Sequence, residues 1–237
     1  MLTPKPWRTE AVMLLIAGVF VCLGIGVVAA EFLRAAGVAA FKSPDSFANV
    51  LLATASFQGA TWLLIFFFLK QHAVNWRDAF GLRNKNLDTS ILLAVITLAL
   101  VLPVILQLEQ YSVQVLQKIG WPLADERAVL LIVNAKSIWL RVYLAFFAIV
   151  LAPVAEEFMF RGVLFPYVKQ LGYPRLAWFG VSFLFALIHA NAPTFVPLLV
   201  LALIFTWLYQ KTNCLLAPIA AHSLFNTANL VILFTQI

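Results

Sequence analysis

Long apolar stretches separated by short polar segments dominate the chain. Residues 11–30 and 50–69 are runs of 20 residues without a charge, and 90–108 is a run of 19. About 20 apolar residues in a helix cross the hydrocarbon core of a bilayer. The first run exceeds the h-region of a signal peptide, about 7–15 residues, so we expect a retained helix. The pattern predicts helices that span a membrane.

The second half of the chain continues this pattern. One apolar segment follows Arg141, another lies within 176–188, and a third extends from residue 192 to the end with Lys211 as its only charge. The last segment is long enough for two passes. The predicted fold class is therefore all-α, a polytopic transmembrane helical bundle of about seven spans, with six to eight compatible with the sequence. We expect a single integral membrane domain, 1–237.

Composition and charge agree with this class. The chain is 63% hydrophobic and 11% charged, whereas a soluble domain carries about 25% charged residues. The net charge of +6 does not indicate a nucleic-acid partner, because the basic residues separate the spans instead of forming a patch. Ten of them fall on one side of the predicted bundle and six on the other. By the positive-inside rule the N-terminus is predicted to be cytoplasmic, in a multi-pass protein of a bacterial cell membrane.

Two polar segments differ from simple loops. Segment 71–89 mixes Trp76 and Phe80 with charges, which suits a short stretch at the membrane interface. Segment 107–123 alternates glutamines with apolar residues and predicts an amphipathic helix that continues past the third span. Its role as a surface helix or as a lid over a site stays open.

The candidate chemistry lies in the apolar segments of the second half. Glu156 and Glu157 follow an uncharged run, and His189 and His222 occur in later segments. Ionisable groups at membrane depth indicate a functional site. A turn at 172–174 lies 16 to 17 residues from both Glu156 and His189, so the two side chains are predicted to meet at one depth in a helical hairpin. A second predicted turn, near Thr212–Cys214, brings His222 back into the membrane. His222 fits the depth of Glu156 less closely and requires tilt or a helix break, for instance at Pro218.

Spacing within the helices separates the roles of these residues. Glu157 and Arg161 are four positions apart and can form an ion pair. The two glutamates point about 100° apart on a helix, so Glu156 is left as the unpaired carboxylate. His222 and Asn226 share one polar face. Each residue alone has a structural explanation, whereas the combination favours a hydrolytic site.

Known routes to hydrolysis in a membrane can be compared with the sequence. The aspartates lie between the predicted spans, which argues against an aspartyl dyad. The motifs H-E-x-x-H and G-x-S-x-G are absent from the sequence. Ser182 and His189 are about 10 Å apart on one helix, too far for a nucleophile and its base. Water activated by a glutamate remains.

Three motifs resemble those of one family. Residues 156–161 match E-E-x-x-x-R, 185–189 match F-x-x-x-H and 222–226 match H-x-x-x-N, in order and on separate predicted helices. This triplet is typical of the CPBP family, which includes CAAX prenyl proteases and bacteriocin-processing, Abi-type enzymes. The resemblance covers about 139–230, which would form the catalytic helical core.

The resemblance implies an intramembrane endopeptidase of the glutamate type, acting on a peptide or membrane-anchored protein in the lipid bilayer. Glu156 and His189 would hold and deprotonate the attacking water, and His222 and Asn226 would donate hydrogen bonds to the oxyanion. No cofactor is expected. Zinc is the disfavoured alternative, held by Glu156, His189 and His222, because Asn226 suits an oxyanion donor better than a ligand.

By the same resemblance, Glu157 and Arg161 would support the site by orienting the helix and fixing the protonation state of Glu156. Two other functions remain open. A non-catalytic protein of the same fold could act as a membrane scaffold or in bacteriocin self-immunity. A proton-relay transporter is less favoured, because we find no inverted repeat.

Overall fold

The computed structural model describes residues 4–82, 86–123, 127–135 and 137–235, and these contain helices and no strand. Arg83, Lys85 and Lys136, three of the basic residues behind the predicted orientation, lie outside the described residues. In chain order the helices are α1 (Thr9–Ala35), the short 3₁₀ helix η1 (Ala39–Phe41), α2 (Phe47–Thr54), α3 (Ala60–Gln71), α4 (Trp76–Ala79), α5 (Leu87–Lys118), α6 (Arg127–Asn134), α7 (Ile138–Phe146), α8 (Ala152–Glu157), α9 (Phe165–Gln170), α10 (Pro174–Ile188), α11 (Ala192–Thr212) and α12 (Leu216–Thr235).

Three π-helical turns join some of these into longer helices. They are η2 (Ala55–Gly59), η3 (Phe147–Leu151) and η4 (Phe158–Leu164). With η2, α2 and α3 form one helix, and with η3 and η4, α7, α8 and α9 form another of 33 residues. The second helix carries the glutamate pair. It continues through the pair to Gln170, as the hairpin predicted from the turn at 172–174 requires.

The described residues contain six helices that are long and apolar enough to cross a membrane. The 15-residue α10 is a seventh apolar helix, shorter than a usual span. Large apolar side chains such as Phe20, Val28 and Phe32 of α1 are more than half exposed, as expected for surfaces that face lipid. The all-α, multi-pass prediction of about seven spans is confirmed.

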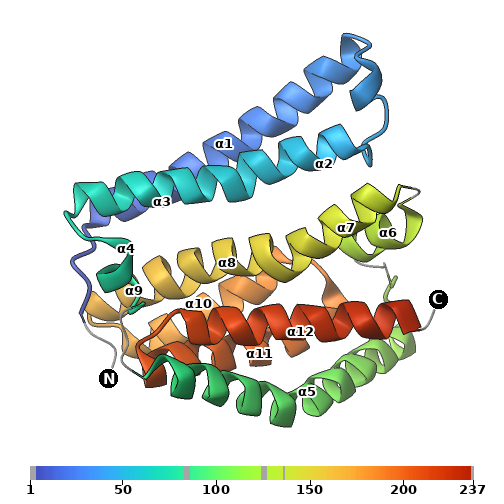
Figure 1. The fold of residues 1–237 in the computed structure, drawn as a ribbon. Coiled ribbons are helices and arrows are strands. Elements are labelled where there is room, and N and C mark those ends of the chain that lie inside the picture. Colours follow the sequence, from blue (N-terminus) through green and yellow to red (C-terminus); the bar gives the residue numbers. More distant parts are fainter. Residues whose placement is uncertain (1–3, 83–85, 124–126, 136, 236–237) are drawn as a thin grey trace.

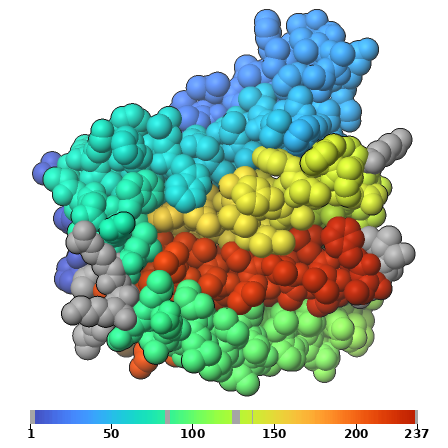
Figure 2. Space-filling view, viewed as in Figure 1, coloured from blue at the N-terminus to red at the C-terminus, as the bar shows by residue number. Residues whose placement is uncertain are grey.

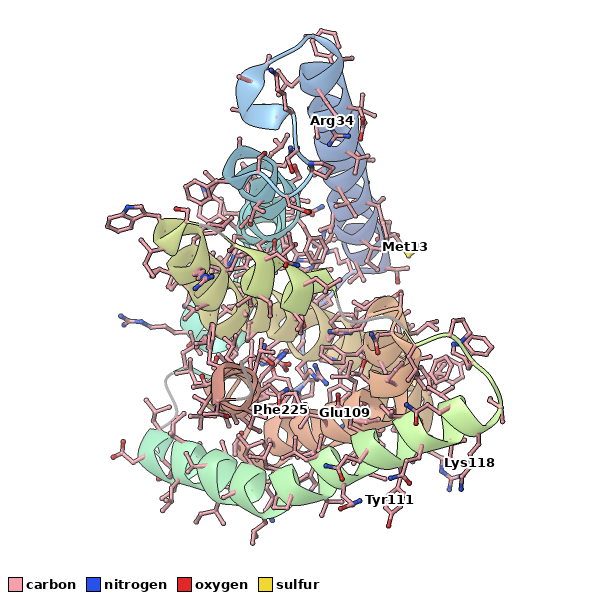
Figure 3. All side chains as sticks on the ribbon, turned by 90° about the vertical axis from the view of Figure 1, so that its right-hand side faces the viewer. Met13, Arg34, Glu109, Tyr111, Lys118 and Phe225 are labelled. Atoms are coloured by element: carbon pink, nitrogen blue, oxygen red, sulfur yellow. The ribbon has the colours of Figure 1, made fainter. Side chains whose placement is uncertain are left out.

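The helices are arranged in layers (Figures 1 and 3). α1 packs against α2 and α3 in one layer, α7 to α9 lie next to it, and α10, α11 and α12 form the centre. α5 covers the far side of α11 and α12, where Ala94 and Leu98 join a buried cluster with Leu201 and Phe205. The far ends of α1 and α2 project beyond the rest of the molecule (Figure 2).

Residues 107–118 of segment 107–123 belong to α5, which is one helix of 32 residues with Pro103 inside it. It ends near Gly120, whose φ of 70° suits glycine. Tyr111 and Lys118 point away from the bundle (Figure 3). The predicted continuation of the helix past the third span is confirmed, and its role stays open.

Two turns occur where the sequence predicts them. Gly172 has a φ of 90° and precedes Pro174, which begins α10. Asn213 adopts a left-handed conformation and ends α11. The helix break considered at Pro218 is wrong, because Pro218 lies in the first turn of α12, where a missing N–H costs no hydrogen bond.

The short polar segment before α5 packs inward. Phe80 is fully buried and its ring lies 4.5 Å from that of Phe158, while its carbonyl accepts a hydrogen bond from the Leu215 N–H. The aromatic ring of Phe80 therefore helps to fix the helix that carries the glutamates, and the interfacial depth of 71–89 stays a prediction.

Candidate active site

Proline interrupts the hydrogen-bond ladder of the long helix just before the glutamates. In the π-turn η3 the Ala152 N–H bonds the Phe147 carbonyl, five residues back. The corresponding partner of the Ala148 carbonyl would be Pro153, which has no N–H. The Asn226 side chain of α12 donates to this carbonyl instead, at 2.7 Å. The π-turn therefore fixes Asn226 beside the helix of the glutamates.

A second proline has the same effect after the glutamates. Pro166 is four residues beyond Gly162 and cannot donate to its carbonyl. The indole N–H of the buried Trp7 donates to the Gly162 carbonyl at 3.2 Å. The residues before α1 thus support the part of the helix that contains Arg161. π-turns often occur at functional sites, and two of them flank the glutamate pair.

His189 is placed by the end of α10. It is the C-cap residue, and its backbone N–H bonds the Ala186 carbonyl, so the Phe185 carbonyl is free for the His189 ring. The ring Nδ1 lies 2.7 Å from that carbonyl oxygen. Ala190 follows with a φ of 49°, an unusual conformation for a residue with a Cβ. The Nε2 atom of His189 is therefore directed away from its own helix.

A buried ionic network lies behind the site. Arg161 and Glu157 are both 0% exposed, and Arg161 Nη1 lies 2.9 Å from Glu157 Oε1. The same carboxylate oxygen is 3.0 Å from His222 Nδ1. Arg161 also donates to the Ala202 carbonyl at 2.9 Å. The predicted ion pair between Glu157 and Arg161 is present, and it extends to His222 on another helix.

Two aromatic rings enclose this network. The Arg161 guanidinium carbon lies 4.5 Å from the centre of the Phe185 ring and 5.4 Å from that of Phe205. Phe205 also stacks on His222, with ring centres 5.1 Å apart. Cation–π contacts stabilise a guanidinium that has lost its water. The rings therefore help to retain the buried charge of Arg161.

Glu156 faces both histidines. Its Oε2 lies 3.9 Å from His189 Nε2 and 3.9 Å from His222 Nε2. Within the described residues this oxygen has no hydrogen-bond partner. The side chains of Glu156 and His189 keep 15% and 19% of their surface exposed, against 6% for His222. Three helices thus bring one carboxylate oxygen and two ring nitrogens to a single point.

The partners of the two rings determine their protonation. Each Nδ1 meets an acceptor, the Phe185 carbonyl for His189 and the paired Glu157 carboxylate for His222. Both Nδ1 atoms must therefore carry a proton, and in a neutral ring the Nε2 is then an acceptor. Three acceptors converge on one point, but a water molecule has two hydrogens to donate. A water molecule that is hydrogen-bonded to Glu156, His189 and His222 at once therefore requires one of the three groups to carry an additional proton.

The same donor types could bind zinc. Two imidazoles and a carboxylate form a known zinc set, and Nδ1–H bonds to oxygen are usual for zinc ligands. However, zinc holds its ligands at about 2.0–2.1 Å in a tetrahedron, which brings them closer together than the 3.9 Å found between Glu156 and each histidine. Among the described residues, no His, Cys, Asp or Glu group has a metal-binding arrangement. The residues as placed do not fit zinc.

Comparison with known proteins identifies the segment that builds this site. Residues 137–228 match the family model described as "Type II CAAX prenyl endopeptidase Rce1-like". This segment of the chain is similar to the Rce1-like family. The match contains Glu156, His189, His222 and Asn226. Over this segment it confirms the family resemblance drawn from the three motifs.

A curated protein is similar to this chain over a shorter region. It is the UPF0177 protein YxdF of Lactococcus lactis subsp. lactis (strain IL1403), 32% identical over 78 residues. The alignment covers 32% of this chain and 42% of YxdF, less than half of that protein's length. No solved structure matches the chain significantly.

The structure also shows residues around the candidate site that the sequence does not point to. Phe205 and the Ala202 carbonyl hold Arg161, and the Ala148 carbonyl holds Asn226. Phe205 and Ala202 are apolar residues in an apolar helix, so nothing in the sequence indicates that they contact Arg161. Pro153, by contrast, is visible within the predicted helix and indicates an interrupted ladder.

Proposed function

We propose that the protein is an intramembrane endopeptidase that hydrolyses a peptide bond of a membrane-associated protein or peptide. The observation that carries this proposal is the convergence of Glu156 Oε2 with the Nε2 atoms of His189 and His222, each at 3.9 Å. The Rce1-like family match supports it, since its description names an endopeptidase. A CAAX-type C-terminus is accordingly one substrate class to test.

In the first step, Glu156 acts as the general base. Its carboxylate takes one proton from water, while the other water hydrogen is bonded to His189 Nε2. The oxygen attacks the carbonyl carbon of the peptide bond, and the electron pair of the C=O bond moves to its oxygen. A base within hydrogen-bond reach of water contributes about 10²–10⁴-fold to the rate.

His222 and Asn226 stabilise the resulting oxyanion. His222 Nδ1–H is engaged with Glu157, so its Nε2 donates only when the ring carries the further proton described above. The Glu157 carboxylate is the counter-charge for that imidazolium. One N–H of the Asn226 amide bonds Ala148, and the second donates to the oxyanion. Such donors are strong in a site of low dielectric.

In the second step, the tetrahedral intermediate collapses. The C–N bond breaks, and the proton held by Glu156 passes to the departing nitrogen. The products are a new carboxyl group and a new amino group, and Glu156 returns to its carboxylate form. Glu157 and Arg161 contact no substrate in this scheme; they position His222.

The test compares peptides in membranes of a deletion strain complemented with wild-type protein or with Glu156→Gln. The amide cannot accept the proton, so the peptides released by the wild-type protein should fall by at least about 10²-fold. Glu10→Gln is the matched control, since Glu10 is exposed at the start of α1. Wild-type peptide levels in the Glu156→Gln strain would contradict the proposed mechanism.

A Glu156→Gln, His189→Gln double variant distinguishes catalysis from a scaffold or self-immunity function. If the protein is an enzyme, the double variant should be inserted and folded but should not restore the phenotype of the deletion strain. Full restoration would show that the fold acts without catalysis.

A further inference from the structure

A cavity of about 680 Å³ lies between the α1–α2 pair and the helix that carries the glutamates. Its walls come from α1, α2, η2, α6 and the start of the long helix, and apolar side chains such as Leu23, Val27 and Leu144 predominate. Phe147 and Ala148 of η3 form part of the wall. The Ala148 carbonyl accepts a hydrogen bond from Asn226, so the wall of the cavity is in direct contact with one residue of the proposed active site.

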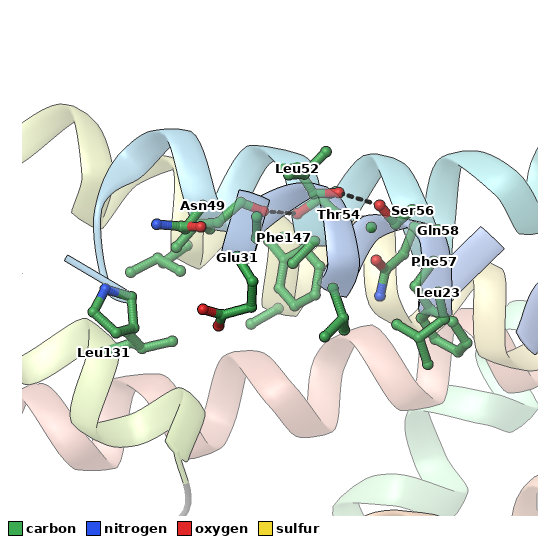
Figure 4. A pocket seen from close by; sticks show the side chains of 18 of the residues that line it. Leu23, Glu31, Asn49, Leu52, Thr54, Ser56, Phe57, Gln58, Leu131 and Phe147 are labelled. Carbon is green, nitrogen blue, oxygen red and sulfur yellow. Dashed lines mark hydrogen bonds between the residues drawn. The ribbon is translucent and has the colours of Figure 1, made fainter. Parts of the chain in front are cut away.

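One side chain in this cavity does not match its apolar surroundings. Gln58 lies in the π-turn η2, is only 6% exposed and lines the cavity. Within the described residues its amide makes no hydrogen bond. Figure 4 shows the amide of Gln58 and the carboxylate of Glu31 projecting from different helices toward the cavity. The Glu31 carboxylate is paired with Arg34, so Gln58 is the polar group of the cavity that lacks a partner.

An amide without a partner costs about 1–3 kcal/mol where it is shielded from water, and the Gln58 amide faces this largely apolar cavity. At membrane depth such a cost is expected where the group has a function. A glutamine amide presents one acceptor and two donors. A hydrocarbon tail offers nothing to these atoms. A peptide main chain offers a C=O and an N–H together, provided that they are not already bonded within a helix.

The spacing along the long helix relates the wall of the cavity to the bond that is cut. Ala148 precedes Glu156 by eight positions, or about 12 Å at 1.5 Å per residue. An extended peptide covers this distance with three to four residues, at about 3.3–3.6 Å each. A substrate can therefore reach from the cavity to Glu156 as a short extended segment.

We propose that Gln58 binds the main chain of an extended peptide substrate close to the cleaved bond, with apolar side chains of that peptide in the cavity. This inference rests on the proposed function and names its substrate class, an unwound apolar peptide segment. Gln58 is a positioning residue and takes no part in proton transfer.

Binding of N-dansyl-Leu-Leu-Leu-amide to purified full-length protein tests this inference. The protein carries Glu156→Gln, so that binding is measured without turnover. Adding Gln58→Met, which keeps the length of the side chain, should weaken binding about tenfold, equivalent to about 1.4 kcal/mol. Gln71→Met is the matched control, because Gln71 is exposed at the end of α3; it should leave binding unchanged.

Two further measurements identify the occupant and the role. A version of this peptide that is methylated at its backbone nitrogens should bind weakly to the protein that contains Gln58. Its affinity for the Gln58→Met protein should be equally low. Thermal unfolding should show Gln58→Met at least as stable as its parent, because an unpartnered amide is removed.

Several results would overturn the inference. The inference fails if the peptide does not bind, or if it binds equally well to Gln58→Met. If hexadecanol displaces the peptide and Gln58→Met has no effect on binding, the occupant is a hydrocarbon chain. A marked loss of stability in Gln58→Met would indicate a structural role. Because binding is measured in an inactive background, these results are independent of whether Glu156 is the catalytic base.

Discussion

The Glu157 carboxylate reaches from α8 to His222 of α12, with Oε1 3.0 Å from the ring Nδ1. The same oxygen receives Arg161 at 2.9 Å. The second glutamate of the pair is therefore connected to the proposed oxyanion donor on another helix. Glu156 alone faces the point where the two histidines meet. Two adjacent residues with the same side chain thus have different tasks because a helix directs them about 100° apart.

The first prediction concerns the charge balance of this network. Arg161→Met should lower the free energy of unfolding by about 3–5 kcal/mol, because it leaves the fully buried Glu157 without its ion pair. Adding Glu157→Gln removes the second charge and should restore a large part of that loss. Unfolding in detergent, followed by circular dichroism, measures both changes.

Activity should not return with stability in that double variant. His222 would have lost the carboxylate that supports its protonated form, so peptide release should stay at least about tenfold below wild type. Recovery of both stability and activity would show that the network only holds the helices together.

A second prediction separates the two uses of Asn226. Asn226→Ala leaves the buried Ala148 carbonyl without its donor, which should cost about 1–3 kcal/mol of stability. It should also reduce the rate by about 10²–10³-fold if the amide stabilises the oxyanion. Adding Pro153→Ala supplies a backbone N–H for the carbonyl and should restore stability but not the rate. A double variant with a restored rate would limit Asn226 to holding Ala148.

The sequence predicts most of the fold, because membrane helices follow from local properties. Apolar length sets the spans. Gly172 and Pro174 mark one turn of the site, and the second occurs at 212–214 as predicted. These turns are sufficient to predict that Glu156 and His189 meet, and the structure places their side chains 3.9 Å apart.

The parts of the site that the sequence does not predict depend on hydrogen-bond register and on contacts between helices. A π-turn has no hydrophobic period of its own, and only Pro153 and Pro166 hint at η3 and η4. The contact of Glu157 with His222 depends on how α12 packs. Gln58, by contrast, can be identified from the sequence, since a glutamine inside the predicted span 50–69 is a polar group at membrane depth.

A third prediction concerns the strained residue after His189. Ala190 has a φ of 49°, where a Cβ costs about 1–2 kcal/mol. Ala190→Gly should raise the free energy of unfolding by up to ~1 kcal/mol, since glycine also loses more entropy on folding. Ala190→Val should lower it by a similar amount and reduce kcat, because it shifts the neighbouring His189. Equal stability of the three proteins would show that this backbone conformation is not strained.

The last prediction concerns metal dependence. In the proposed mechanism Glu156 deprotonates water without a metal, so peptide release by purified protein should be unchanged after treatment with EDTA and 1,10-phenanthroline. Elemental analysis of the purified protein should find zinc well below one atom per chain. The 3.9 Å separations between Glu156 and the two histidines are the structural reason, since zinc would bring these atoms closer together.

If activity depends on zinc instead, the zinc content and activity of the histidine variants will show it. If the two histidines bind zinc through Nε2, then His189→Ala and His222→Ala should each lose zinc, and added zinc should restore the activity of chelated wild-type protein. In the metal-free mechanism, zinc content does not change with either variant. Glu157→Gln extends this comparison. If His222 bound zinc, removing the carboxylate that accepts from its Nδ1–H would lower the affinity of the site for the metal. Zinc loss in all three variants together with chelator-sensitive activity would replace the metal-free mechanism.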